Sequence, residues 1–126
     1  MRLVHEPVTA ADDDFFEQRT ESLATNVELA DSLVSQARGL MFRRSIPDDY
    51  ALAFRFDSTT VRDLHMLFVF FPIDAVWAVD GVVERVERLY PWRSFARARA
   101  DLIVELPAGA AAEVEAGDRL TLEDDS

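Results

Sequence analysis

The sequence contains no cysteine and no lysine, and it has only four glycines. The absence of cysteine excludes disulfide bonds, thiolate catalysis and cysteine metal sites. The longest apolar run, residues 66–73, is far shorter than the roughly 20 residues that a membrane-spanning helix needs. The first residues also lack the apolar core of a secretion signal. We therefore expect a cytoplasmic protein that does not contact a membrane.

The charge is strongly negative, because 24 acidic residues face 13 basic residues that are all arginine, which gives a net charge of −11. Such a charge argues against non-specific binding to nucleic acid. An acid excess without lysine is typical of proteins from salt-loving microbes, in which concentrated salt screens the repulsion. We expect a halophilic, haloarchaeal origin. The alternative is an ordinary acidic protein from an arginine-rich organism with a high-GC genome.

The length of 126 residues fits a single domain over 1–126, which is large enough to fold without disulfides or metals. We find no internal repeat and no linker. Residues 1–21 predict either a short strand followed by a capped helix or a loosely attached acidic extension. The core is expected over residues 22–123.

The most apolar stretch, residues 64–79, predicts two buried strands divided by Pro72, which cannot donate a ladder hydrogen bond. Asp80-Gly81 then predicts a tight hairpin turn between residues 75–79 and 82–90. Further strands are expected over 23–30, 50–56, 102–106 and 119–123, and short helices over 33–38 and 110–115. This pattern favours a mainly β fold, a compact β-sandwich or barrel of about seven short strands with one or two short helices.

Several short motifs follow one another along the chain. They are Gly39-Leu40-Met41-Phe42-Arg43 directly after Arg38, Ala51–Phe54, His65-Met66 leading to Pro72-Ile73-Asp74, Val104–Gly109, and Gly117-Asp118. In this order they resemble the domain of unknown function 192 family (DUF192) of small, mainly bacterial and archaeal domains, over about residues 22–123. The resemblance implies a compact β-sandwich or barrel and no established activity. The family has a polar Lys-Asn-Thr trio after Met66, whereas this chain has Leu67-Phe68-Val69.

The candidate functional residues are Arg38, Met41, Arg43, His65, Met66 and Asp74. Asp74 is either a general base in an apolar pocket or a structural carboxylate that caps a turn or pairs with an arginine, Arg38 first among them. The arginines either receive an anion or pair on the surface with Asp31, Asp48 or Asp49. His65 and the two methionines either bind a soft metal or fill the core, with His65 partly buried. No known catalytic or metal-binding spacing supports a catalytic or metal-binding role for these residues, so we predict no catalytic residue, metal or cofactor.

A second constellation consists of basic and aromatic residues close together in sequence: Arg85, Arg88, Arg93, Arg97 and Arg99 beside Tyr90, Trp92 and Phe95. Arginines between aromatic residues occur on surfaces that bind single-stranded nucleic acid, but Glu84, Glu87 and Asp101 dilute this charge. We predict no nucleic-acid partner.

The sequence as a whole favours a non-enzymatic binding or accessory module whose partner is an unknown small molecule or protein. The alternative is an enzyme with a small-molecule site around Asp74 and His65. An exposed aromatic patch or an apolar pocket would favour the module. Convergence of Asp74 and His65 in a cleft would favour the enzyme. The oligomeric state has no signature in the sequence.

The charge of −11 predicts that salt stabilises the protein, because mobile ions screen the repulsion between carboxylates. Thermal unfolding should shift to higher temperature between low and multimolar KCl. A midpoint that stays constant or falls would contradict the halophilic interpretation.

Overall fold

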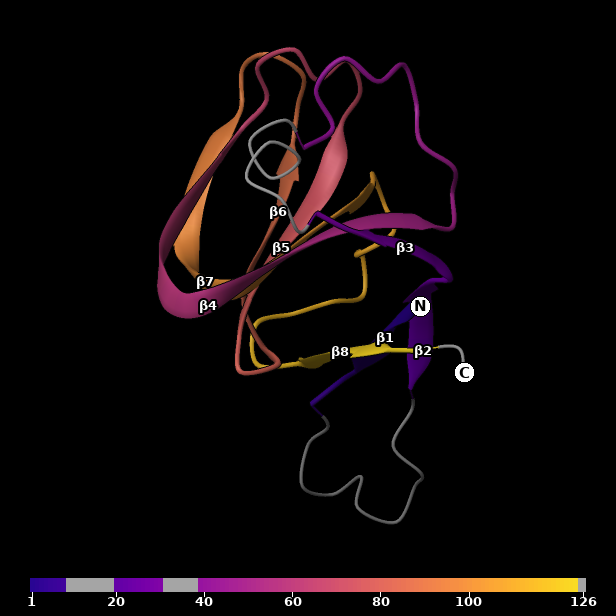
Figure 1. Cartoon of the computed structure of the whole chain (residues 1–126), viewed down its shortest axis with the longest axis vertical. Helices are drawn as coiled ribbons and strands as arrows, with labels where there is room; N and C mark the ends of the chain where they lie inside the picture. Colours follow the sequence, from indigo (N-terminus) through magenta and orange to yellow (C-terminus); the bar gives the residue numbers. More distant parts are fainter. Residues whose placement is uncertain (9–19, 31–38, 125–126) are drawn as a thin grey trace.

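The structure is a computed structural model that describes residues 1–8, 20–30 and 39–124. Its described part is built on eight strands: β1 (Arg2–Glu6), β2 (Glu21–Ala24), β3 (Asn26–Leu29), β4 (Tyr50–His65), β5 (Ile73–Val79), β6 (Val82–Leu89), β7 (Phe95–Pro107) and β8 (Arg119–Glu123). They form one sheet in the order β2-β1-β8-β6-β5-β7-β4-β3 (Figure 1). The β3–β4 pair is parallel and the other pairs are antiparallel.

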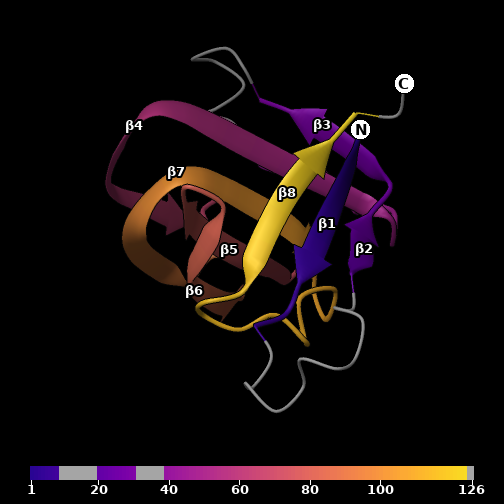
Figure 2. The ribbon, with the colours of Figure 1, turned by 90° about the horizontal axis from the view of Figure 1, so that it is seen from below.

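The sheet curls so that its two edge strands, β2 and β3, follow each other along the chain with only Thr25 between them. Figure 2 shows β1 and β8 crossing in front of β5, β6 and β7. The prediction of a mainly β fold is confirmed. A closed barrel is not seen, because the edges of this eight-stranded sheet do not pair within the described residues.

Strand β5 and the second half of β7, residues 102–106, are buried on both faces, because alternate side chains enter two separate apolar cores. One core contains Trp77 and Ile103 and lies under the loops at the upper end of Figure 1. The other contains Val76 and Val104 and lies against β1 and β8. Strands buried on both faces have nearly continuous apolar sequences, which explains residues 102–106 and 73–79.

The hairpin over Asp80-Gly81 is confirmed, with β5 and β6 in antiparallel register from Ile73↔Leu89 to Val79↔Val82. Asp80 has φ = 50° and Gly81 has φ = 80°, so both turn residues adopt the left-handed backbone of a type I′ turn. The last strand, residues 119–123, is also confirmed.

Other predictions are wrong. Residues 66–72 form a loop and not a strand, although they are the most apolar run of the chain. Residues 110–115 form successive turns, in which Ala110, Ala112 and Val114 each donate to a carbonyl three residues earlier, and no helix forms among the described residues. The helix expected over 33–38 lies outside the described residues.

Asp74 fastens a turn of the chain to the central strand. Its side chain is buried, and Oδ2 accepts hydrogen bonds from the backbone N–H groups of Gly109 at 2.9 Å and Ala111 at 3.0 Å. Oδ1 accepts from Arg88 Nε of β6 at 2.5 Å. The carboxylate is therefore satisfied by backbone amides and an arginine, as buried charge requires. The arginine is Arg88, whereas Arg38, the partner that we named first, lies outside the described residues.

Asp118 has a similar role at the other end of the sheet. It accepts hydrogen bonds from the N–H groups of Val8 at 3.0 Å and Glu115 at 2.9 Å, and its Oδ2 lies 2.7 Å from Nε2 of buried His5. Burial alone would raise the pKa of Asp118, but these hydrogen bonds together lower it. The carboxylate thereby joins β1 to the turn that precedes β8.

Replacement of Asp74 by asparagine should destabilise the fold by about 2 kcal/mol, because the amide keeps one acceptor oxygen and replaces the other by an NH2 donor, so that either Arg88 or the two backbone amides lose their acceptor. Urea unfolding at neutral pH measures the change. Asp63→Asn is the matched control, since Asp63 pairs with Arg97 at an exposed site and should contribute little. An Asp74→Asn midpoint equal to that of the control would contradict this structural role.

Candidate functional site

Three loops meet at the upper end of the molecule in Figure 1: residues 39–46, 66–72 and 90–94. Backbone hydrogen bonds join them, from Phe42 N to Phe68 O at 2.8 Å and from Trp92 N to Met66 O at 2.9 Å. Met66 N also donates to Ser94 O at 3.2 Å. The loops therefore form one connected surface over the first of the two cores.

Four aromatic side chains project from these loops, and we call Phe42, Phe68, Phe70 and Trp92 the aromatic cluster. They are 42% to 54% exposed. The Phe42 and Phe68 rings stack at a centroid distance of 5.1 Å, and Trp92 meets the Phe68 ring edge-to-face at 5.0 Å. Phe70 lies 5.9 Å from Trp92. Contiguous exposed apolar surface of this kind marks interaction sites in soluble proteins.

The backbone of three cluster residues is strained. Phe42, Phe68 and Trp92 have φ values of 68°, 60° and 67°, in the left-handed region that bulky side chains rarely adopt. Such a conformation costs on the order of 1 kcal/mol or more for each residue. Glycine or asparagine would relieve this strain. The combination of strain with solvent exposure therefore points to a role of these rings other than stability.

The charge of the three loops is opposite to that of the protein. Residues 39–46, 66–72 and 90–94 contain no aspartate or glutamate, although the chain has 24 of these residues. The same loops contain the arginines 43, 44 and 93. Among the described residues, Arg44 and Arg93 form no ion pair. The aromatic cluster is thus flanked by cations and free of acids.

Arg43 is held in place by two neighbours. Its Nη1 donates to the Tyr50 hydroxyl at 3.0 Å, and its Nη2 lies 3.6 Å from Glu28 Oε2. The Tyr50 hydroxyl in turn donates to Glu28 at 2.8 Å. Burial, followed by this hydrogen bond to Glu28, raises the pKa of Tyr50 to about 12. Arg43 therefore pairs with Glu28, which is not one of the three aspartates expected from the sequence.

A buried carboxylate lies under the first loop. Glu105 of β7 is opposite Leu52 of β4 and Ala75 of β5, at the centre of the sheet. Its Oε1 would lie 3.3 Å from a Cβ at Gly39, which also has φ = 52°. Glycine is therefore required at 39 both for its backbone conformation and for this close approach. Burial raises the pKa of Glu105 to about 7, although the charge of Arg43 opposes the shift.

The structure places the predicted site residues in different surroundings. Met66 is fully buried and Met41 is half-buried, and both pack in the core under the loops. His65 is exposed at the end of β4, not partly buried, and its Nδ1 accepts a hydrogen bond from Leu67 N at 3.3 Å. Asp74 is anchored as described above. Arg38 lies outside the described residues, so its role stays a prediction.

The structure does not bring the side chains of Asp74 and His65 together in one cleft. The two carboxylate oxygens of Asp74 accept three hydrogen bonds, whereas His65 faces solvent. In the described part of the chain, no group of three or more histidine and acidic side chains is placed to hold a metal ion. No helix there is long and apolar enough to cross a membrane.

The arginines of residues 85–99 do not form an acid-free surface. Arg85 lies 3.3 Å from Glu87, Arg88 pairs with Asp74, and Arg97 lies 3.3 Å from Asp63. These pairs support the interpretation of this segment as an ion-paired strand surface.

The functional candidates predicted from the sequence do not include Phe42, Phe68 or Phe70, and Trp92 was assigned to the arginine constellation. Residues 64–71 were interpreted as a buried strand because their composition is apolar and aromatic. The absence of acids in three separate segments was the available signal, but only the fold shows that these segments meet.

Comparison with known proteins supports the fold and gives a family. Residues 15–122 match the model of DUF192, described as an uncharacterised ACR. A crystal structure from Sinorhizobium meliloti, described as a putative transcription regulator, is 25% identical; the match covers 95% of this chain and 92% of that one, with a TM-score of 0.76. A protein of unknown function from Novosphingobium aromaticivorans is 19% identical over 97% of this chain and 84% of that one, with a TM-score of 0.75. No curated protein matches the chain.

Glu105→Gln should stabilise the protein at alkaline pH and not in acid. Folding raises the pKa of this carboxyl from 4.5 to about 7, so ionisation above pH 4.5 favours the unfolded chain until the folded carboxyl also ionises. The variant should therefore match the wild type near pH 4.5 and exceed it by about 3 kcal/mol at pH 8. Urea unfolding at several pH values measures the difference.

The control is Glu84→Gln, which removes a carboxylate from an exposed position on β6. Parallel stability curves for the wild type and Glu105→Gln over this pH range would contradict the assignment.

Proposed function

The chain belongs to the uncharacterised DUF192 family, and we propose that it is a non-enzymatic binding module that docks an acidic polypeptide on its aromatic cluster. The observation that carries the proposal is the exposure of Phe42, Phe68 and Trp92 on strained backbone. A stable surface loop does not need three large aromatic residues with positive φ. Strain of this kind is found where function fixes the residue.

The composition of the surface fits a protein partner. Phenylalanine, tryptophan and arginine are enriched at protein interfaces, and a few central aromatic residues supply most of the binding free energy. Phe68 connects the three loops of the aromatic cluster, because its ring contacts Phe42 of one neighbouring loop and Trp92 of the other. We therefore assign it the role of the principal anchor.

The positive charge around the aromatic cluster favours a partner that carries carboxylates. Arg44 and Arg93 flank the aromatic cluster and have no acidic partner within the part of the chain that the structure describes. A peptide segment in which aromatic or aliphatic residues alternate with carboxylates would fill both needs, apolar contact and charge pairing. Long-range repulsion from the net charge of −11 limits such binding to segments that reach the cluster locally.

Single-stranded nucleic acid also combines negative charge with flat rings, but it fits this surface less well. Bases stack on free aromatic faces, whereas the Phe42 and Phe68 rings stack on each other. A nucleic acid would also expose a long run of phosphates to the negative charge of the remaining surface. The description of the Sinorhizobium relative as a putative transcription regulator is therefore not extended to DNA binding by this chain.

The test is the binding of a fluorescent peptide that alternates phenylalanine with glutamate, measured by anisotropy at low salt. The wild type should bind it, and Phe68→Asn should weaken binding at least tenfold, since a central aromatic anchor contributes about 2 kcal/mol. Phe95→Asn is the matched control, because Phe95 is an exposed aromatic residue outside the cluster, 5.1 Å from Arg97. It should bind as the wild type does.

A stability measurement on the same variants separates function from folding. Phe68→Asn should change the free energy of unfolding by no more than about 1 kcal/mol, because relief of the left-handed strain offsets the lost ring contacts. Destabilisation by 3 kcal/mol or more would show that the aromatic cluster is structural. Equal binding of a lysine-containing peptide, or binding of a single-stranded oligonucleotide in place of the acidic peptide, would also overturn the proposal.

A further inference from the structure

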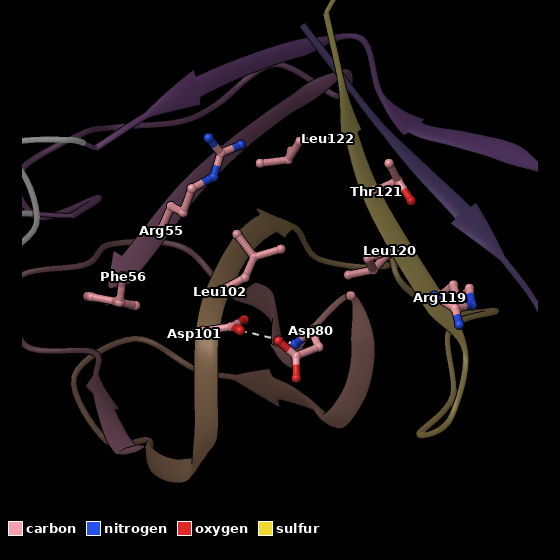
Figure 3. A pocket seen from close by; sticks show the side chains of 10 residues that line it. Arg55, Phe56, Asp80, Asp101, Leu102, Arg119, Leu120, Thr121 and Leu122 are labelled. Carbon is pink, nitrogen blue, oxygen red and sulfur yellow. Dashed lines mark hydrogen bonds between the residues drawn. The ribbon is translucent and has the colours of Figure 1, made fainter. Parts of the chain in front are cut away.

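A second surface feature lies on the side of the sheet that carries the second apolar core, away from the aromatic cluster. It is an open pocket of about 490 Å³ between β8 and the β4–β7 pair, with the Asp80-Gly81 turn at one end (Figure 3). The side chains of Leu102, Leu120 and Leu122 line its middle. This volume lies within the range of roughly 300–1,000 Å³ that small-molecule sites occupy.

The pocket exists because the sheet separates at this point. β8 pairs with β6 at one residue pair, Val82↔Arg119, and otherwise pairs with β1. On the other side of the pocket, the β4–β7 ladder is interrupted between Arg55↔Leu102 and Thr60↔Ala100. Four residues of β4 therefore lie opposite Asp101 alone, an extended bulge of the kind found beside functional sites.

The two ends of the pocket carry opposite charge. Figure 3 shows Arg55 reaching toward Leu122 at one end and the carboxylates of Asp80 and Asp101 at the other, with Leu102 between them. Asp80 N donates to Asp101 Oδ2 at 3.1 Å, which holds the two acidic residues together.

In the described part of the chain, no ion pair includes Arg55, Asp80 or Asp101. Arg119 lies on the β8 rim beyond Leu120 and is likewise outside these pairs. A ligand with charges at both ends would therefore pair with groups that the protein leaves open.

We propose that this pocket binds a small zwitterion with an aliphatic side chain, of the size of an amino acid or a dipeptide. Arg55 receives the carboxylate in a forked, charge-assisted hydrogen bond, as guanidinium groups do. Asp80 and Asp101 receive the ammonium group, and the three leucines contact the aliphatic side chain. This site shares no residue with the aromatic cluster, so it stands independently of the proposed peptide docking.

The first experiment uses the wild-type protein and needs no variant. Leucine and leucyl-leucine are titrated into the isotope-labelled protein, and the backbone amide shifts of residues 80–82, 101–102 and 119–122 are followed by NMR. At least one of the two probes should shift these amides in a saturable way. Leucine amide, which lacks the carboxylate, and 4-methylpentanoate, which lacks the ammonium group, should bind at least tenfold more weakly than leucine if leucine is the bound probe. For leucyl-leucine, the corresponding amide and N-acetyl derivatives serve the same purpose.

The second experiment assigns the two ends. Arg55→Gln should weaken binding of the zwitterion at least tenfold and leave the weak affinity of the carboxylate-free analogue unchanged. Asp101→Asn should do the converse, weakening the zwitterion but not the ammonium-free analogue. Arg97→Gln is the control, because Arg97 is an exposed arginine of β7 outside the pocket.

Two results would overturn the proposal. One is the absence of saturable shifts at these amides with both zwitterions. The other is equal affinity of a zwitterion and its one-charge analogues. Neither result bears on peptide binding by Phe68, so failure of this site and failure of the aromatic cluster are distinguishable.

Discussion

The burial of β5 and the second half of β7 on both faces is the constraint on which the remaining structure depends. An open sheet that hides both faces of its centre must cover one of them with something other than its own strands. Here β1 and β8 cover one face as the sheet curls, and the loops around Leu40, Met66 and Val69 cover the other. The buried side chains of these loops therefore hold them on the core. The exposed side chains of the same loops do not contribute to this packing.

The motifs that identify the family fall into two groups: some hold the strands of the sheet together, and one lies in the loops that cover it. Asp74 joins the Pro-Ile-Asp motif to the loop after Pro107, and Asp118 joins the last turn to His5, so these two carboxylates hold the sheet together. Gly39 serves the covering loops, because its backbone conformation and its approach to Glu105 exclude a side chain. Four of the five motifs thus have two structural roles: they attach turns to the sheet and hold a loop over a buried carboxylate.

Local chemistry made part of this structure predictable. Asp80-Gly81 determines a hairpin by itself, because its two residues tolerate positive φ. The run 66–71 was misread because apolar composition signals contact with a core but not the backbone conformation that brings it there. Phe42, Phe68 and Trp92 are unusual residues for left-handed backbone, so no propensity indicates it. The pairing of Asp74 with Arg88 depends on the β5–β6 register, which places these two residues opposite each other.

The substitution of Leu67-Phe68-Val69 for the family's polar trio now has a structural meaning. Val69 is buried in the core, while Leu67 and Phe68 are exposed, and the Phe68 ring contacts Phe42 and Trp92. The bonds that join the three loops run between backbone atoms, from Phe42 N to Phe68 O and from Trp92 N to Met66 O. Because these bonds do not involve the exposed side chains, the loops can exchange polar for aromatic residues without disturbing the sheet. The backbone anchors preserve the fold, and the side chains above them determine the chemistry of the exposed surface.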